Sequence, residues 1–224
     1  MNSLLFWDVD TQNDFIHPDG KLYVPGGEQI IPLLASLTEF AHRNHIRILA
    51  SADDHQAGHR ELSETPDFNE TFPPHCMRGS RGQEKIPETA LRNPLLIEPD
   101  HHLPGIGEKA VAHDGDILFQ KHWFDVFTNP NVAPVVRALD PAAIVLYGVA
   151  TDVCVRFAIE GLARIRPHTR LYFVTDSSRA IRPALAEHLL KEWAEEGIRL
   201  VRSEEILEGG VLETPTTSAS LATS

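Results

Sequence analysis

Cys154 follows an apolar segment and a tight pair of small residues, an arrangement that can place a reactive thiol at the start of a helix. Residues 143–149 form an apolar run that predicts a buried strand, and after Thr151 the apolar residues recur at roughly helical spacing. Unpaired backbone N–H groups in the first turn of a helix favour a thiolate and can hold an oxyanion. The alternative is a buried, inert thiol, because free cysteine is among the most buried residue types.

Two carboxylates stand at the end of the first apolar segment. In Asp8-Val9-Asp10, strand alternation places both acidic side chains on one face, with Asp10 nearer the carboxyl end. Such residues often cap the following helix or bind turn amides. The spacing also resembles the phosphatase pattern Asp-x-Asp-x-Thr/Val, in which Asp8 would be the phosphate-accepting nucleophile. Gln12 occupies the fifth position of that pattern, which counts against a phosphatase.

A second polar group follows the second apolar segment. Asp53 and His55 are two residues apart just past a predicted strand, so their side chains can point the same way and share one cation. A histidine from the following loop, His59 or His75, would complete a set of ligands open to water or substrate. Two cysteines in the chain exclude a cysteine-rich structural zinc site. A solvated polar loop is the alternative, because twelve histidines make chance clusters easy.

Strand-like and helical patterns alternate along the chain. Strands are predicted at residues 4–9, 46–51, 117–120, 143–149, 171–175 and 198–201, and helices most clearly at 28–44, 131–139, 151–165 and 183–196. This order predicts a three-layer α/β/α fold with a doubly wound, mostly parallel six-stranded sheet. Asp10, Lys121 and Cys154 would then meet at one edge of the sheet. Residues 53–116 lack apolar periodicity, and so long a stretch indicates a functional loop.

Length, charge and cysteine content exclude several classes of protein to which the chain could belong. We expect one domain over residues 1–212 and a flexible tail over 213–224, whose composition is rich in Thr and Ser. The formal net charge of −12, without a basic run, argues against a nucleic-acid partner. We find no apolar stretch long enough for a bilayer, no signal-peptide pattern and too few cysteines for a disulfide framework. A cytoplasmic protein without a membrane partner is the expectation.

Four segments together resemble the isochorismatase-like cysteine hydrolases, and among them the nicotinamidases. They are Asp-Thr-Gln-Asn-Asp-Phe at 10–15, the lysine at 121, the turn at 148–155, and Asp-x-His at 53–55 with Pro-Pro-His-Cys at 73–76. The resemblance covers approximately residues 4–201. The four segments follow one another along the chain in the same order as in members of the family. The chain is therefore similar to those members over almost its whole length.

The resemblance implies a catalytic triad of Asp10, Lys121 and Cys154. It also implies a cis peptide between Val149 and Ala150, which would direct the Ala150 and Cys154 N–H groups into an oxyanion hole. Cys154 would attack a carboxamide and form a thioester, with Asp10 as the base and Lys121 as a stabilising charge. Isochorismatases themselves cleave a vinyl ether without a cysteine nucleophile, so Cys154 argues against that reaction.

The resemblance further implies a divalent metal, zinc, iron or manganese, held by Asp53, His55 and His75, with Phe15 and Phe72 on either side of the substrate ring. The metal would bind the pyridine nitrogen and orient it. The implied substrate is a small carboxamide, first of all nicotinamide, which would give nicotinate and ammonia. Hydrolysis of a ureido, carbamoyl or aliphatic amide and a non-catalytic metal-binding scaffold stay open as alternatives. Because the family often forms dimers or larger assemblies, we expect a homo-oligomer.

Overall fold

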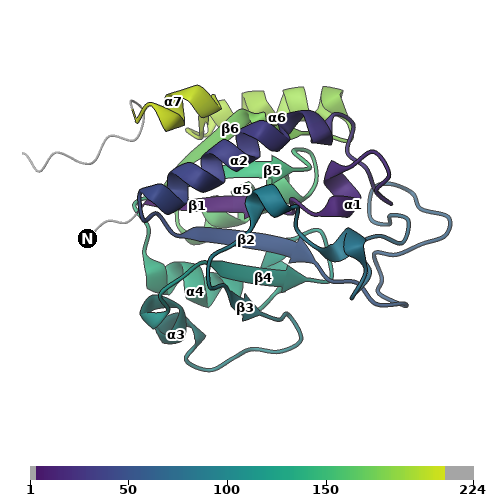
Figure 1. Ribbon diagram of the computed structural model, residues 1–224, viewed down its shortest axis with the longest axis horizontal. Helices are drawn as coiled ribbons and strands as arrows, with labels where there is room; N and C mark the ends of the chain where they lie inside the picture. The colour runs from purple at the N-terminus through teal and green to yellow at the C-terminus, as the bar shows by residue number, and fades with distance from the viewer. Residues whose placement is uncertain (1–3, 210–224) are drawn as a thin grey trace, which may run out of the picture.

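A single parallel sheet organises the computed structural model, which describes residues 4–209 (Figure 1). Within these residues seven strands pair in the order β3-β4-β2-β1-β5-β6-β7. They are β1 (Leu4–Val9), β2 (Ile48–Asp53), β3 (Leu95–Ile97), β4 (Ile117–Lys121), β5 (Ala143–Val149), β6 (Arg170–Arg179) and β7 (Arg199–Val201). The predicted α/β fold with a parallel sheet is confirmed. The predicted number of strands is wrong, because β3 is a three-residue edge strand whose central Leu96 is exposed and so gives no buried apolar run.

Helices cover both faces of the sheet. They are α1 (Asn13–Ile16), α2 (Gly27–Arg43), α3 (Ile106–Ala112), α4 (Val132–Leu139), α5 (Cys154–Ile165), α6 (Pro183–Glu195) and α7 (Ser203–Leu207). Helix α2 crosses in front of the strands, with α4 and α5 behind them (Figure 1). The four predicted helices are confirmed, although α5 begins at Cys154 and not at Thr151. Cys154 is therefore the first residue of its helix.

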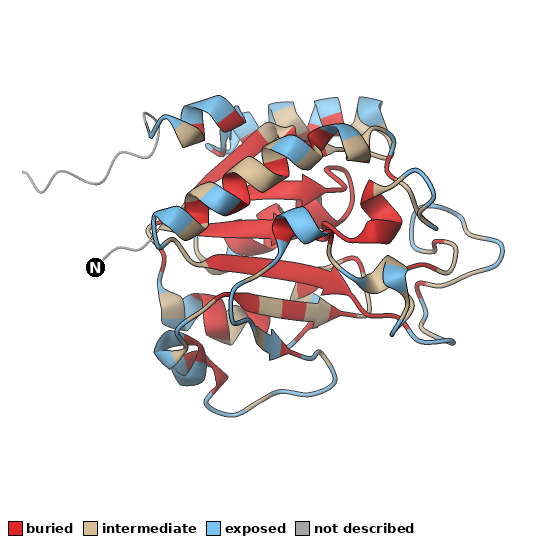
Figure 2. Cartoon of the chain, in the orientation of Figure 1, coloured by how far each residue is buried: buried red, intermediate tan, exposed pale blue. Residues whose placement is uncertain are grey.

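The core lies between the central strands and the apolar faces of the helices. All seven residues of β5 are buried, and Figure 2 shows β1, β2 and β5 buried along almost their whole length. Trp7 on β1 stacks on Phe119 of β4 with ring centroids 5.8 Å apart. Helix α2 turns Ile30, Leu34 and Leu37 toward the core and its polar residues outward, which is the pattern of a helix that covers a sheet.

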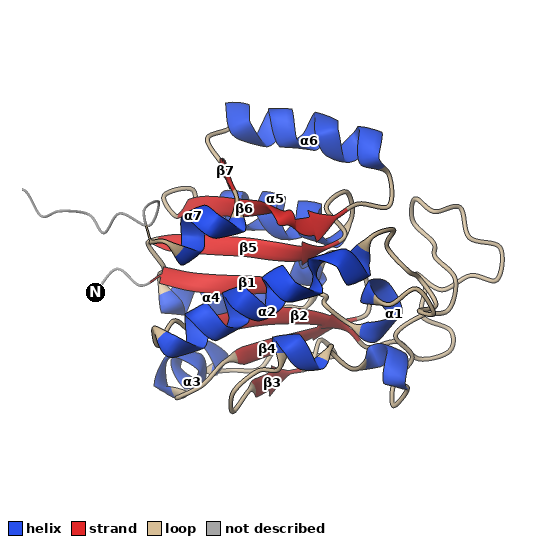
Figure 3. Cartoon of the chain, turned by 45° about the horizontal axis from the view of Figure 1, so that its top comes forward, coloured by secondary structure: helices blue, strands red, loops and turns tan. Residues whose placement is uncertain are grey.

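The strands all end at one side of the molecule, and the loops gather there (Figure 3). Residues 54–116 begin at this edge and contain two short 3-10 turns, β3 and α3. Isolated bridges between Gln12 and Lys85 and between His55 and Met77 tie this region to the strand ends. Gly148 at the end of β5 has φ 115°, and a side chain there would collide with the Val9 carbonyl group. Glycine thus lets β1 and β5 approach each other at this edge.

No helix among residues 4–209 is long and apolar enough to cross a membrane. One continuous sheet runs through the described residues. The single domain over residues 1–212 stays a prediction, and the tail predicted for residues 213–224 lies outside the described residues. The cytoplasmic location, the homo-oligomer and the lack of a nucleic-acid partner stay predictions.

Candidate active site and metal centre

The ends of β1 and β4 and the start of α5 bring three of the predicted residues together. Lys121 Nζ lies 2.9 Å from Asp10 Oδ2 and 3.7 Å from Cys154 Sγ. Asp10 and Lys121 are fully buried, and Cys154 is 8% exposed. Strand ends of a parallel sheet converge at one edge, and these side chains meet there.

Lys121 also pairs with a second carboxylate, that of Asp53 at the end of β2. Burial alone would lower the pKa of Lys121, but Asp10 and Asp53 together raise it well above its usual value. Burial likewise opposes ionisation of Asp53, yet Lys121 and the neighbouring histidines hold the pKa of that carboxyl below its usual range. The lysine is therefore a fixed cation between two carboxyl groups.

Asp10 and Cys154 both favour their protonated forms more than exposed groups would. Burial raises the pKa of Asp10, and Lys121 offsets this only in part. Burial also raises the pKa of the Cys154 thiol well above its usual value, although Lys121 acts in the opposite direction. Burial therefore opposes the resting thiolate predicted at the helix start. Loss of solvent around the sulfur has the largest effect on the pKa of Cys154, and the charge of Lys121 acts against it.

The turn before α5 presents backbone donors beside the thiol. The Val149–Ala150 peptide is cis, as the resemblance implies. Val153 and Val155 donate their N–H groups to the Ala150 carbonyl at 3.0 and 3.1 Å. Within the described part of the chain, neither the Ala150 nor the Cys154 N–H has a backbone or side-chain acceptor. Two donors are therefore left for an oxygen atom near Sγ.

Four buried side chains next to the lysine form a second cluster. Ligand atoms of Asp53, His55, Glu61 and His75 all lie within 4.8 Å of one another. His75 Nε2 is 3.4 Å from Asp53 Oδ2 and 3.6 Å from Glu61 Oε1, and His55 Nε2 is 3.9 Å from an oxygen of each carboxylate. Sequence reasoning missed Glu61. No motif or periodicity marks it, and only the path of the loop, where Phe72 N–H bonds the Glu61 carbonyl at 2.8 Å, turns it inward.

Hydrogen bonds on the outer side of each imidazole direct a lone pair into the cluster. His75 Nδ1 is 2.7 Å from the Pro73 carbonyl, which can only accept, so Nδ1 carries hydrogen. His55 Nδ1 is 3.4 Å from Nδ1 of His59, and the Gln56 N–H approaches that same His59 nitrogen at 3.3 Å. An acceptor at His59 Nδ1 makes His55 Nδ1 the donor. In the neutral imidazoles, both Nε2 atoms then carry a lone pair that faces the carboxylates.

The buried charges of the cluster influence one another: burial alone would lower the pKa of His75, but its contacts with Asp53 and Glu61 raise it above its usual value. Among the described residues, the buried atoms without a hydrogen-bond partner include His55 Nε2, His75 Nε2, Asp53 Oδ2 and Glu61 Oε2. Burial, with the charge of Asp53, raises the pKa of Glu61 to about 8, and burial lowers that of His55 to about 4. Two imidazoles and two carboxylates that converge on one point suit zinc, iron or manganese. These residues therefore fit a divalent ion.

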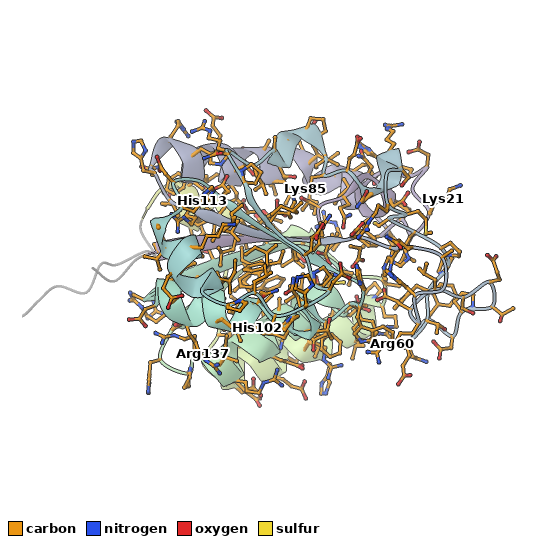
Figure 4. All side chains as sticks on the ribbon, turned by 90° about the horizontal axis from the view of Figure 1, so that it is seen from below. Lys21, Arg60, Lys85, His102, His113 and Arg137 are labelled. Atoms are coloured by element: carbon orange, nitrogen blue, oxygen red, sulfur yellow. The ribbon has the colours of Figure 1, made fainter. Side chains whose placement is uncertain are left out.

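His59, the alternative ligand, lies behind His55 and not in the cluster. Its ring packs against that of His122 with centroids 4.2 Å apart. Both histidines line an outer cavity of about 370 Å³ that also contains Arg60, whose guanidinium lies 3.7 Å above the ring of Trp123. Figure 4 shows Arg60 at the loop-bearing end of the molecule, away from His113 and Arg137. The outer cavity thus adjoins the cluster without contributing to its four ligand atoms.

A small apolar cavity of about 20 Å³ adjoins Cys154. Its lining residues are Phe15, Leu22, Val24, Phe72, Val149, Ala150, Val153, Cys154 and Ile181. The rings of Phe15 and Phe72 have centroids 5.3 and 6.4 Å from that of His75. The two phenylalanines therefore lie between the nucleophile pocket and the buried cluster. A larger cavity of about 430 Å³ contains Leu4 and Leu5 at the amino end of β1, so it lies away from this chemistry.

Asp8 belongs to a separate buried ion pair. Its Oδ2 lies 2.8 Å from Lys85 Nζ and accepts the Thr11 hydroxyl at 3.0 Å. The side chain is almost fully buried and has no contact with Lys121. A carboxylate enclosed and neutralised in this way is poorly placed to attack a phosphate ester, so the phosphatase alternative gains no support.

Comparison with known proteins agrees with the resemblance. A nicotinamidase/pyrazinamidase of Mycobacterium tuberculosis is 30% identical over 166 residues, 73% of this chain and 80% of that protein. A pyrazinamidase of Pyrococcus horikoshii in complex with zinc has a TM-score of 0.68 at 23% identity, with 89% of this chain and 99% of that one covered. An N-carbamoylsarcosine amidase from Thermoplasma acidophilum has a TM-score of 0.66 at 23% identity, with coverage of 92% and 98%. The isochorismatase domain matches residues 4–205, and the chain belongs to the isochorismatase family.

Proposed function

We propose that this isochorismatase-family hydrolase is a cysteine-dependent amidase that cleaves an uncharged aromatic carboxamide, nicotinamide first of all, into a carboxylate and ammonia. One observation carries the proposal. The thiol of Cys154 opens into an apolar pocket whose two aromatic rings, Phe15 and Phe72, face a buried ligand cluster. The apolar and aromatic lining of this cavity suits a flat ring whose carboxamide points toward the thiol, and the cavity of about 20 Å³ must widen to admit such a ring.

The chemistry begins with proton transfer from Cys154 to Asp10. Asp10, whose carboxylate pairs with Lys121, accepts the thiol proton as sulfur attacks the carbonyl carbon. Lys121 stabilises the negative charge that passes between them. As the C–S bond forms, the carbonyl oxygen becomes negatively charged. The Ala150 and Cys154 N–H groups then hold this oxygen. Each such donor is worth about 3 kcal/mol.

Collapse of the tetrahedral adduct breaks the C–N bond, and Asp10 returns its proton to the leaving ammonia. The carbonyl is then a thioester on Cys154. Asp10 next takes a proton from water as the water oxygen attacks that carbonyl. When the C–S bond breaks, sulfur regains the proton and the carboxylic product leaves. Each proton that Asp10 accepts is therefore returned within one cycle.

The buried cluster contributes orientation. When bound by Asp53, His55, Glu61 and His75, a divalent ion would supply a position for a ring nitrogen. The chain's own contribution is to fix the ligand atoms and to line the pocket with the rings of Phe15 and Phe72. Orientation of a reacting group can account for a large part of catalysis.

A carbamoyl or ureido amide is the second candidate substrate. The similarity to an N-carbamoylsarcosine amidase supports it. Such a substrate carries a carboxylate that needs a cationic partner, and no Lys or Arg lines the pocket beside Cys154 in the described chain. The lining therefore favours an uncharged substrate. A metal-binding scaffold without turnover is the non-enzymatic alternative.

An ammonia-release screen with metal analysis of the same sample tests the proposal. We expect release from nicotinamide and pyrazinamide to exceed that from an N-carbamoyl amino acid and an aliphatic amide. Rapid acid quench followed by mass spectrometry should find an acyl group on Cys154. Preference for the carbamoyl substrate would favour the second candidate, and neither ammonia nor acyl adduct with any substrate would favour the scaffold.

A further inference from the structure

At its carboxyl end, β2 is no longer paired with β1. Strand β1 pairs with β2 as far as Val9 opposite Ser51, and Asp10 then turns away with φ 49°. On the other side the pairing continues, since the Asp54 N–H donates to the Lys121 carbonyl at 2.9 Å. In a parallel strand, backbone groups of successive residues point to alternate sides. The N–H and carbonyl of Asp53 consequently face the side that β1 has left.

The side chain of Gln12 takes the place of the missing strand. Its Oε1 accepts the Asp53 N–H at 2.7 Å, and its Nε2 donates to the Asp53 carbonyl at 2.8 Å. The second hydrogen on Nε2 goes to the Gln83 carbonyl at 2.7 Å. The amide is fully buried, and its donors and acceptor fit these partners in one orientation only. Both backbone groups of Asp53 are thus held by one side chain.

Asp53 is the residue that both clusters share. One carboxylate oxygen contacts Lys121, and the other lies 3.4 Å from His75 Nε2. A small rotation of its backbone would move both oxygens at once. We infer that Gln12 is a positioning residue that fixes Asp53 as a metal ligand and as the partner of Lys121. This inference rests on the proposed function for its metal ion.

A purely structural role predicts a different result, and Asn13 provides the matched comparison. Its Nδ2 donates to the Arg81 and Glu84 carbonyls, both at 2.9 Å, so it anchors the same short turn that Gln12 reaches through Gln83. Asn13 makes no hydrogen bond to Asp53. If Gln12 merely holds the turn, the two side chains should be equivalent.

Cobalt(II) titration of the full-length, chelator-stripped protein separates these possibilities. We expect Gln12→Met to weaken cobalt binding by about 10–100-fold, as loss of a partner behind a metal ligand does. Visible absorption at saturation should also change, because Asp53 would no longer be held. Asn13→Leu should keep cobalt affinity within about twofold of the unaltered protein, because Asn13 bonds the Arg81 and Glu84 carbonyls and not Asp53. Equal affinities and spectra for the two variants would overturn the role of Gln12 alone. An unaltered protein without cobalt uptake would overturn the proposed metal centre first.

Two further measurements decide the matter if Gln12→Met does not fold. Gln12→Asn retains an amide but withdraws it by one methylene, and we expect an intermediate loss of cobalt affinity. In the unaltered protein, hydrogen exchange of the Asp53 amide should be as slow as that of its β2 neighbours, because Gln12 is its acceptor. Exchange at the rate of a surface amide would show that the side chain does not hold Asp53.

Discussion

Two groups of buried polar residues share Asp53 but differ in how their charges are balanced. In the first, Lys121 lies between the carboxylates of Asp10 and Asp53 beside the Cys154 thiol. In the second, Asp53 and Glu61 face two imidazoles, and several inward atoms have no partner among the described residues. The first group can carry out proton transfer with its own residues. The second needs a cation to complete it.

Their positions in the fold explain the difference. Asp10 and Lys121 lie at the ends of central strands, and Cys154 begins a helix packed on the sheet, so the backbone alone fixes their separation. Glu61 and His75 come from the region between β2 and β3, whose path depends on bridges and side-chain contacts. A reaction centre built on strands and a ligand cluster built on a loop should therefore respond differently to substitution.

Cys154→Ala should produce the largest effect, and it should be confined to the first group. Without sulfur no thioester forms, and we expect kcat to fall by about 10⁴-fold or more. Cobalt affinity should stay within about twofold, because Cys154 is not among the four ligands. Ammonia release and cobalt titration of one preparation measure both. Substantial turnover by the variant would remove the nucleophile from the mechanism.

Lys121→Met tests whether the first group is balanced by its lysine. The substitution leaves two carboxyl groups buried without their cation, and breaking a buried ion pair costs about 3–5 kcal/mol in the free energy of unfolding. Urea unfolding at pH 7 measures this loss. Lys85→Met is the matched control, because it breaks the buried pair with Asp8 at a distance from the thiol. Both variants should lose stability, but only Lys121→Met should also abolish ammonia release.

The parts of the site that lie on strands could be predicted from the sequence. Periodicity located β1, β4 and β5 within a residue or two, and a parallel sheet brings the residues at their ends together. Asp10, Lys121 and Cys154 follow from that geometry. Edge strand β3 was missed because a short, half-exposed segment carries no such signal.

Features that depend on tertiary packing could not be predicted. Glu61 enters the cluster through the path of a loop without apolar periodicity. The hydrogen bonds from the Gln12 side chain to the Asp53 backbone join residues 41 positions apart. The burial of Cys154 is a related case. A helix start favours a thiolate, whereas burial raises the pKa of the thiol, and the degree of burial is a property of the folded chain.

His55→Ala tests the second group through substrate choice. We expect loss of bound metal and a fall of about 10²-fold in kcat/KM for nicotinamide, because the ring is no longer oriented. A non-heterocyclic amide should lose much less, since its attack geometry does not depend on a ring nitrogen. The ratio of the two losses is the informative quantity, with metal content measured in parallel. Equal losses would assign His55 to the general stability of the site.

Alkylation of the two thiols should show the smallest effect and reports directly on the first group. Burial raises the pKa of both Cys154 and Cys76, so we expect each to be mainly the unreactive thiol at pH 7. Below the pKa, the thiolate fraction and the iodoacetamide rate should rise about tenfold per pH unit. Cys154 borders a cavity and has Lys121 at 3.7 Å, whereas Cys76 is fully buried beside Asp14.

As the pH rises, iodoacetamide should therefore alkylate Cys154 faster than Cys76. Peptide mass spectrometry at each pH measures the two rates. Lys121→Met should reduce the difference in alkylation rate between the two thiols, because the cation that lowers the pKa of Cys154 is lost. A fast reaction of Cys154 that is independent of pH between 6 and 8, on the order of a free thiolate, would contradict the protonated resting state. Asp10 would then have no thiol proton to accept, and its role would be limited to the water that hydrolyses the thioester.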